Sequence, residues 1–393
     1  MRRVSAFVSL LSFVGMSQMI CSSSALAAVG DFKDFSIHQH YISARAMGMG
    51  GAFVAAADDA TALFYNPAGL ANLGESHVNL SLAQVGADSK LPKLSSDINS
   101  ASSTNNIADM VSLLESKYGN HYSVRVGALQ AIWARPRWAL AVIPVDLNLE
   151  MEIHQTVGPQ LAVVAHQDTT IAYGRGWKLN VADGSMSVGA TGKAIYRGYY
   201  NKSISAIELA FDSNILKKED VSEGLTFDFD LGWMWKPNIP QSGFWSWIKH
   251  VKPTVGATVR NAVDYGFKTN MHVLDKNSRE PAKLQRRLDV GTMFELPDWW
   301  IWRTRFVADL RDIGHENFTV KKGTHLGVEF LWKLASWWQG GWRAGINQGY
   351  FTAGFNGDFA LFRLDLVTYA NEVGTSSSPK ASRVYMAKAS LDF

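Results

Sequence analysis

The chain is poor in cysteine, in charge and in long apolar runs. Its 393 residues include a single cysteine, Cys21, and only 19% of them are charged, below the usual quarter. Lysine and arginine (38) nearly balance aspartate and glutamate (35) and form no basic block, so the charge gives no support to a nucleic-acid partner. Beyond the N-terminus there is no run of about 18 apolar residues, which excludes a bundle of membrane-spanning helices.

The motifs of familiar enzyme and metal sites are also missing. The sequence contains no His-Glu-x-x-His, no cysteine and histidine spacing typical of a metal site, and no recognisable catalytic pair of carboxylates. Gly48, Gly50 and Gly51 do not make a convincing phosphate-binding loop, because position 53 is phenylalanine and no predicted strand precedes them. We therefore predict no enzymatic activity, no cofactor and no metal.

Residues 1–27 have the three parts of a secretory signal peptide. Met1-Arg2-Arg3 is positively charged, residues 4–20 are largely apolar, and Ala25-Leu26-Ala27 is a small-residue cleavage site. The alternative is a lipoprotein signal that uses Cys21, although Ile20 is bulky for the position before such a cysteine. Cleavage after Ala27 would remove the only cysteine, so we expect a mature chain without a disulfide or a thiol.

Aromatic residues and glycine, by contrast, are plentiful, and apolar and polar residues alternate along many segments. The chain has 14 tryptophans and 33 glycines, and its mean hydropathy is near zero at -0.06. In residues 226–235, Phe227, Phe229 and Leu231 alternate with Asp228 and Asp230, which is the period of a strand with one apolar face. Residues 302–310, 324–333, 360–369 and 385–393 repeat the pattern, with charges on the face away from the aromatic residues.

Strands of about ten residues fit a tilted membrane crossing, and they predict an all-β fold, a transmembrane antiparallel β-barrel of about 14 strands (12–16) over residues 75–393. A soluble β-sandwich is the alternative. Tryptophans cluster at segment ends, which indicates an interfacial girdle, although hairpin packing would also cluster them. The predicted strands lie near residues 76–85, 122–134, 138–149, 169–179, 185–197, 225–235, 253–260, 287–295, 302–310, 324–333, 342–347, 350–355, 359–369 and 384–393.

Two segments between strands, residues 106–118 and 204–216, are predicted to contain loop helices. The charges on the polar faces are predicted to line the lumen and to brace its wall as a network of opposite charges. Its members are Asp228, Asp230, Arg303, Arg305, Asp309, Glu329, Arg363 and Asp365.

Residues 43–70 are rich in small residues and have no period-two pattern. They predict a compact insert of short helices joined by glycine turns. Asp58 and Asp59 stand before an alanine and leucine stretch as a helix N-cap, and Asn66 is held extended by Pro67 in a turn.

The motifs of this insert resemble the N-terminal hatch of the FadL/TodX family of hydrophobic-compound transporters. They are Ala-Arg-Ala-Met-Gly-Met-Gly-Gly-Ala-Phe from residue 44, Ala-Asp-Asp-Ala-Thr-Ala from residue 57 and Tyr-Asn-Pro-Ala-Gly-Leu from residue 65. Residues 343–354 and 362–366 add a similar pair of hairpin strands, and the likeness to PorV-like and TraF-like outer-membrane proteins is closer still. The resemblance implies a 14-stranded barrel plugged by a hatch at residues 28–74. The hatch motif is then Arg45, Gly48, Gly50, Gly51, Asp58, Asp59, Asn66, Pro67, Ala68 and Gly69.

The resemblance also implies a function. In the FadL-like family a hydrophobic ligand enters from the extracellular loops, reaches an apolar pocket and leaves sideways through the wall as the hatch shifts. We therefore expect a passive importer of hydrophobic compounds such as long-chain fatty acids. The alternative is a plugged barrel that acts as a protein-interaction or assembly module in secretion or conjugal transfer, and an outer-membrane enzyme is a third hypothesis. Apolar extracellular loops would favour the importer, and a polar, sealed lumen would favour the module.

The expected location is the outer membrane of a Gram-negative bacterium, reached through a cleaved signal peptide. The predicted closing strand, which ends in Phe393, resembles the C-terminal aromatic signature by which such barrels are recognised for assembly. The expected partners are membrane lipid and lipopolysaccharide, a hydrophobic small molecule, and an outer-membrane or periplasmic protein.

Overall fold

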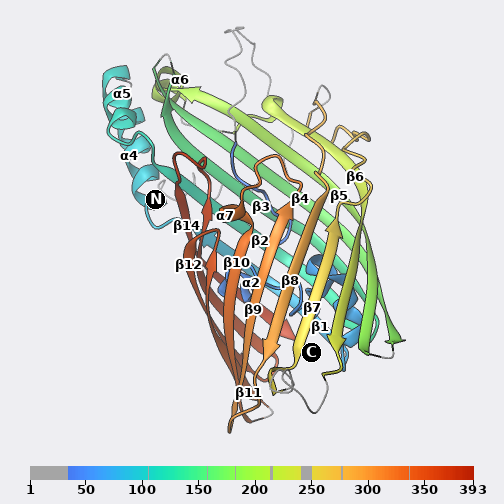
Figure 1. Cartoon of the computed structure of the whole chain (residues 1–393). Helices are drawn as coiled ribbons and strands as arrows, with labels where there is room; N and C mark the ends of the chain where they lie inside the picture. The colour runs from blue at the N-terminus through green and yellow to red at the C-terminus, as the bar shows by residue number, and fades with distance from the viewer. Residues whose placement is uncertain are drawn as a thin grey trace. The chain divides into compact units, whose positions relative to one another are not determined.

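A computed structural model describes residues 34–393 except 105, 157, 182, 213–215, 240–249, 276–277 and 336. These residues form a closed barrel of fourteen antiparallel strands in which each strand pairs with its neighbours in sequence and β1 pairs with β14 (Figure 1). The predicted fold class is therefore confirmed. The strands are β1 His77–Ala87, β2 His121–Arg135, β3 Trp138–Gln155, β4 Pro159–Val181, β5 Gly184–Ser205, β6 Val221–Pro237, β7 Pro253–Arg260, β8 Arg287–Glu295, β9 Trp302–Ile313, β10 Thr324–Ala335, β11 Trp338–Asn347, β12 Tyr350–Phe359, β13 Phe362–Glu372 and β14 Ala381–Asp392.

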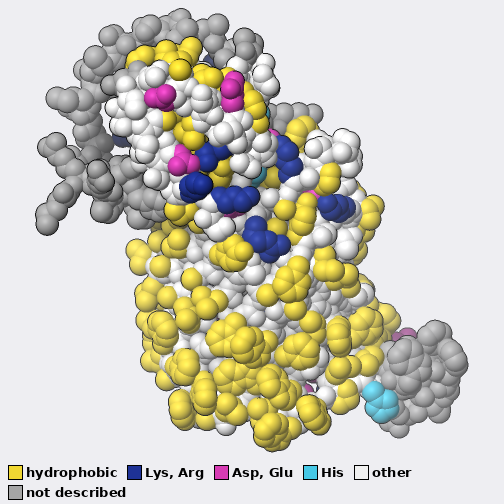
Figure 2. Space-filling view, turned by 90° about the vertical axis from the view of Figure 1, so that its left-hand side faces the viewer, with side chains coloured by type: hydrophobic (Ala, Val, Ile, Leu, Met, Phe, Trp, Pro, Cys, Tyr) yellow, Lys and Arg dark blue, Asp and Glu magenta, His cyan; other side chains and the backbone are white. Residues whose placement is uncertain are grey.

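The alternation of side chains gives the barrel an apolar outside and a polar inside. On β6, Phe227, Phe229 and Leu231 are 51–56% exposed, whereas Asp228 and Asp230 are 1% exposed. Apolar side chains cover the lower part of the surface as a broad band (Figure 2). A sandwich would bury this apolar face in its core, so the sandwich alternative is wrong, and the outer surface suits lipid. No helix among the described residues is long and apolar enough to cross a membrane.

The two ends of the barrel differ. At the turn end, β2 and β3, β4 and β5, β10 and β11, and β12 and β13 are joined by two residues each, and this is also where β1 begins and β14 ends. At the loop end lie α4 Leu91–Ser103, α5 Ile107–Glu115, α6 Ala206–Phe211, η3 Lys218–Asp220, α7 Val320–Gly323 and the loop of residues 261–286. The loop helices predicted within residues 106–118 and 204–216 are thus α5 and α6, and α4 was not predicted.

All described tryptophans lie in the half of their strand or turn that is nearer the turn end, as a girdle would require. Trp299 and Trp300 are the most exposed of them, at 76% and 82%. Trp245 and Trp247 lie outside the described residues, as do the predicted signal peptide and Cys21. The described tryptophans are Trp133, Trp138, Trp177, Trp233, Trp235, Trp299, Trp300, Trp302, Trp332, Trp337, Trp338 and Trp342.

Residues 34–74, here called the inner segment, lie inside the barrel. They contain α2 Ala44–Gly48, α3 Ala62–Tyr65 and η2 Pro67–Asn72. α2 contacts β11 to β14, while η2 contacts β3 to β6 on the other side of the closed sheet. A segment that touches strands all round a closed sheet must occupy its lumen. Its apolar residues form one core with inward residues of the wall, such as Ile132, Ile143 and Met293.

Candidate functional site

A ring of glycines lets the wall touch the inner segment closely. A Cβ added at Gly189 or Gly232 would lie under 3.0 Å from the backbone or side chain of Pro67 or Asn66. Because the inner segment occupies the space where these side chains would be, it is seated tightly against at least five strands. The wall glycines for which this holds are Gly174, Gly176, Gly189, Gly232, Gly256, Gly327 and Gly345, here called the glycine ring.

Arg45 of α2 joins the inner segment to the wall. Its guanidinium donates to both oxygens of the Glu329 carboxylate on β10 at 2.8 and 2.7 Å, and to Asp58 and Asp59 at 2.7 and 2.8 Å. Arg305 of β9 donates to the second oxygen of Asp58 at 2.6 Å. Asp58 and Asp59 were expected to cap a helix, but the N-cap of α3 is Thr61, and the two carboxylates are held by arginines instead. Asp59 also accepts from the backbone N–H and hydroxyl of Thr61.

The predicted hatch motif includes four glycines, of which Gly48 ends α2, Gly50 and Gly51 follow it, and Gly69 lies in η2. Gly50 and Gly51 have φ of 68° and 81°, which favours glycine, and their carbonyls accept from His325 and Arg311 of the wall at 2.7 Å. A Cβ at Gly48 would lie 3.2 Å from Arg343 and Gly354 of the wall, closer than ordinary packing. A Cβ at Gly69 would lie only 2.0 Å from the carbonyl oxygen of Ala57.

Asn66 fixes the turn that follows α3. It is extended, as predicted, and its side-chain oxygen accepts from the N–H of Ala68 at 3.1 Å at the start of η2, where Pro67 takes the first helical position. Its amide donates to the carbonyls of Val54 at 2.9 Å and of Trp233 on β6 at 3.1 Å. A fully buried amide thus connects two turns of the inner segment with the wall.

We expect Asn66→Ala to assemble into a barrel but to lower its free energy of unfolding by about 1–3 kcal/mol, because it leaves buried carbonyls without their donor. The measurement is the temperature at which the compact gel band of the unheated protein is lost. Asn99→Ala, on the exposed side of α4, is the matched control and should not shift that temperature. An Asn66→Ala barrel as heat-resistant as the wild type would contradict this role.

The predicted lumen charges are mostly buried, but they are not one network. Arg305 and Glu329 belong to the Arg45 cluster, and Arg363 pairs with Asp365 at 3.0 Å. Asp230 pairs with Lys193 at 2.7 Å. Asp309 accepts instead from the backbone N–H groups of Phe53 and Val54, at 2.6 and 2.8 Å, and so holds the inner segment directly.

Arg303 is the exception, and its assignment to the lumen is corrected. It has the inward parity of Arg305, but it is the second residue of β9, where the barrel wall ends. Its side chain is 49% exposed and its closest carboxylate is that of Asp298, at 3.5 Å. A guanidinium at the rim is hydrated by water, so Arg303 does not require a buried carboxylate partner.

Residues 34–43, which precede α2, extend from it toward the loop end, and we call them the strap. The carbonyls of Gln39 and His38 accept from Arg125 and Arg287 of the wall, and the carbonyls of Asp34 and Ser36 accept from Asn317. The strap is therefore bound through its backbone by donors from opposite sides of the lumen.

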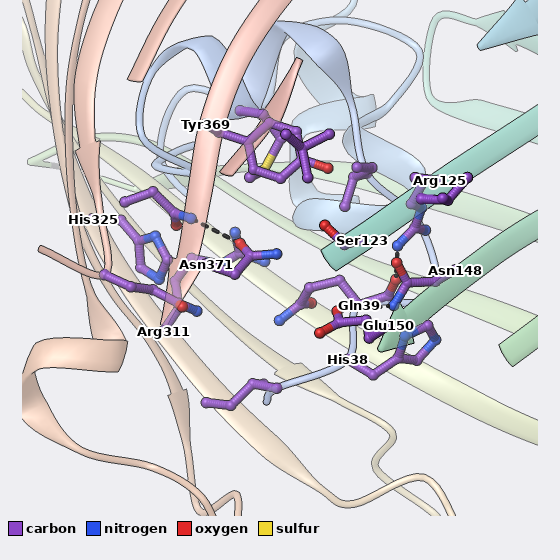
Figure 3. A pocket seen from close by; sticks show the side chains of 17 residues that line it. His38, Gln39, Ser123, Arg125, Asn148, Glu150, Arg311, His325, Tyr369 and Asn371 are labelled. Atoms are coloured by element: carbon purple, nitrogen blue, oxygen red, sulfur yellow. Dashed lines mark hydrogen bonds between the residues drawn. The ribbon is translucent and has the colours of Figure 1, made fainter. Parts of the chain in front are cut away.

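The cavity beside the strap is small and is lined by polar and apolar side chains in about equal measure. It has a volume of about 40 Å³, room for one or two water molecules. Figure 3 shows Arg125, Asn148 and Glu150 facing Arg311 and His325 across it. Burial lowers the pKa of His38 to about 4, although the neighbouring Asp168 carboxylate acts to raise it. His38 is therefore neutral at pH 7. An apolar solute finds no site here, because such sites are larger and mostly apolar.

The longest interruption of the wall among the described residues lies between β6 and β7. Residues 231–235 of β6 pair with residues 255–259 of β7, but residues 221–230 continue toward the loop end without a ladder on that side. The loop of residues 261–286 lies in the gap. Its described residues make scattered backbone bonds to β6, from Ala262 N–H to the Phe229 carbonyl, from Leu225 N–H to that of Thr269 and from Glu223 N–H to that of Arg279. We call this place the seam.

Two carboxylates of β6 hold the loop in the seam. Glu223, which is fully buried, accepts from the backbone N–H groups of residues 273–275, from the Ser278 hydroxyl and from the Tyr196 hydroxyl. Asp228 accepts from the N–H groups of Val263 and Asp264 at 3.0 and 3.3 Å. This predicted lumen charge therefore holds the loop, and it forms no ion pair with a described cation. No local pattern predicted a role for Glu223, which precedes the regular alternation of β6.

An apolar cluster lies behind the seam. Phe267 of the loop packs with Ile195 of β5 and with Leu284, all three at most 5% exposed. The guanidinium of Arg197 lies 5.2 Å from the centre of the Phe267 ring. Among the described residues, no group of three or more His, Cys, Asp or Glu side chains is placed to hold a metal ion.

Comparison with known proteins adds structural neighbours only. No family model and no curated protein sequence matches the chain. The toluene transporter TbuX of Ralstonia pickettii is similar over 90% of this chain and 99% of its own (10% identity, TM-score 0.47). The monoaromatic hydrocarbon channel CymD is similar over 88% and 96% (13%, 0.46), and the toluene transporter TodX of Pseudomonas putida over 90% and 98% (10%, 0.40). Similarity at these levels transfers no activity to this chain.

Proposed function

We propose that this chain is an outer-membrane importer of small hydrophobic compounds that leave the barrel through the seam between β6 and β7. The observation that carries the proposal is the loop of residues 261–286, which replaces a continuous ladder in the wall. To open a regular wall, the continuous ladder between two neighbouring strands would have to break, whereas the described part of the loop makes three backbone bonds to β6 along this stretch.

The closed lumen supports a sideways route. An apolar solute would have to displace buried ion pairs to follow the barrel axis, and an unpaired buried charge costs several kcal/mol. At the seam it meets apolar surface on both sides. Phe227 and Phe229 are exposed outside, and the Phe267 cluster lies inside.

The loop end also exposes apolar side chains, the feature expected of an importer. On the seam loop, Val263, Tyr265, Met271 and Val273 are 47–65% exposed, and on α6 Ile207 and Phe211 are 58% and 64% exposed. Because the short turns of outer-membrane barrels face the periplasm, the loop end would face outward, where it could collect apolar solutes.

We expect cells that carry this protein to take up labelled toluene or a labelled long-chain fatty acid several-fold faster than cells that lack it. The two probes separate the aromatic compounds named for TbuX and CymD from the fatty acids expected from the sequence. Heat-modifiable gel mobility and surface labelling must first show that the protein is assembled. Equal uptake with and without assembled protein, for both probes, would reject the importer.

The seam loop should loosen when its anchor is weakened. Glu223→Ala leaves several N–H groups and two hydroxyls without their acceptor, each worth about 1–3 kcal/mol when buried. We expect proteases added to intact cells to cut residues 261–286 at least about tenfold faster than in the wild type, because cleavage follows the population of the open loop. Glu219→Ala, an exposed neighbour, is the control. Equal cleavage of the two variants would show that Glu223 does not hold the loop.

The second candidate is a sealed barrel that serves as an interaction or assembly module. The observation that favours it is the polar lumen, with a cavity of about 40 Å³. A module should leave the uptake of both probes unchanged when it is deleted, while the assembly of a partner system in the outer membrane fails. The uptake experiment therefore separates the two candidates.

A further inference from the structure

We infer that the turn end of the lumen holds a binding site for a small organic carboxylate with an apolar body. The inference rests on a cavity of about 380 Å³, here called the turn-end cavity, which is lined by β6, β7 and β8 where these neighbouring strands reach the turn end (Figure 1). The cavity beside the strap has only about 40 Å³. Sites for small molecules have volumes of about 300–1,000 Å³, so the turn-end cavity suits a ligand near the lower end of that range.

The strand register brings three side chains of the turn-end cavity to one level on the lumen face. Thr254 of β7 pairs with Met293 of β8. Gly256 of β7 pairs with Met234 of β6, so the same register, two residues nearer the turn end, places Lys236 beside Thr254. All three side chains line the cavity, and Met293 also belongs to the apolar core between the inner segment and the wall. The cavity therefore begins where that core ends.

The charges of the turn-end cavity favour an anion. Its described lining contains two lysines, Lys236 and Lys252, and one carboxylate, Glu295. That carboxylate is already occupied, because Arg305 lies 3.1 Å and Lys252 lies 3.6 Å from it. Lys236 forms no ion pair with a carboxylate among the described residues, and the Thr254 hydroxyl makes no hydrogen bond to one of them. An incoming carboxylate would accept from both, and a hydrogen bond from an ammonium is about twice as strong as one between neutral groups.

The remaining lining of the turn-end cavity suits an apolar body. Ile239, Pro253 and Met293 contribute hydrocarbon surface to it. A ligand gains free energy in proportion to the apolar surface that it removes from water, so an anion without an apolar body would forgo this contribution. An aromatic acid such as benzoate has both parts. Because the short turns of such barrels face the periplasm, the ligand would enter from the periplasm, away from the apolar side chains of the loop end.

The test uses the full mature protein in a neutral detergent, with benzoate, benzamide and acetate as probes. Saturation-transfer difference NMR titrations, which suit weak ligands, measure the dissociation constant of each probe. We expect benzoate to bind at least about tenfold more tightly than benzamide, which lacks the charge, and than acetate, which lacks the ring. In Lys236→Met the binding of benzoate should weaken at least about tenfold, whereas that of benzamide should not change.

Lys178→Met is the matched control, because it removes an exposed lysine of β4 near the same end of the barrel but outside the described lining of the cavity. It should bind benzoate as the wild type does. If Lys236→Met fails to fold, Lys252→Met tests the same cavity from a side chain that is 65% exposed, and it should also weaken benzoate.

Four results would each overturn the inference. They are no binding of benzoate, equal binding of benzoate and benzamide by the wild type, undiminished binding by the variants of the cavity lysines, and an equal loss in Lys178→Met. All of them are measured on the purified protein, so they do not depend on uptake through the seam.

Discussion

Cells that carry Leu225→Cys together with Thr269→Cys are expected to take up hydrophobic compounds at the background rate until a reductant is added. The two residues form an isolated antiparallel bridge across the seam. Cα atoms in such pairs are about 4.5–5.5 Å apart, within the range that a disulfide spans. The bond would fasten the loop to β6, and uptake through the seam would stop.

The absence of other cysteines makes this experiment clean. Cys21 lies in the predicted signal peptide, so the mature variant would contain only the engineered pair. Ala353→Cys with Thr368→Cys, partners in the continuous ladder of β12 and β13, is the matched control and should leave uptake unchanged. Normal uptake by the seam variant, with its disulfide confirmed by thiol labelling, would mean that solutes take another route.

Glu329→Ala is expected to lower the free energy of unfolding by about 3–5 kcal/mol, which is the largest effect we predict for a single substitution in the lumen. The carboxylate is fully buried and accepts from Arg45 and Arg343 at 2.7–2.8 Å, with Arg305 at 3.7 Å. Without it, three guanidinium groups remain together in a medium of low polarity. Reversible urea unfolding in detergent measures the change.

Two variants calibrate this result. Arg303→Ala, the exposed arginine at the rim, should change the free energy of unfolding by no more than about 0.5 kcal/mol. Arg45→Met with Glu329→Met should recover part of the loss, because it removes both members of a buried pair. A Glu329→Ala barrel as stable as Arg303→Ala would show that the Arg45 cluster contributes nothing to seating the inner segment.

The strands could be predicted wherever one face meets lipid and the other meets the lumen. Alternation then continues along the strand, as on β6 and β10. It fails on residues 159–168 of β4, where Leu161, Val163 and Ala165 face outward but are buried, near α5 and α6. With apolar residues on both faces, the pattern has no period of two. α4 was not predicted because its only large apolar residues are Leu91, Leu94 and Ile98, in a serine-rich stretch.

The site was predictable only in part, for a related reason. Sequence motifs identified Arg45 and Asn66, because their neighbours resemble a known pattern. Their roles depend on partners in the wall, Glu329 and Trp233, which lie more than a hundred residues away in the sequence. No local pattern predicts these partners. The glycine ring could not be predicted either, because a glycine in a strand does not indicate which segment packs against it. Glu223 binds a loop whose course depends on the premature end of the β6 and β7 ladder.

The glycine ring has a consequence for the order in which the barrel is built. The inner segment precedes β1 in the chain, yet the wall that it touches extends to β12 and beyond. A finished barrel would have to be threaded by forty residues with several bulky side chains. The sheet must therefore curl around a segment that is already inside, and the pairing of β1 with β14 comes last. The inner segment would then be the core around which the sheet closes during assembly. Replacing it with a flexible linker should slow barrel closure in the cell even where the finished barrel is stable.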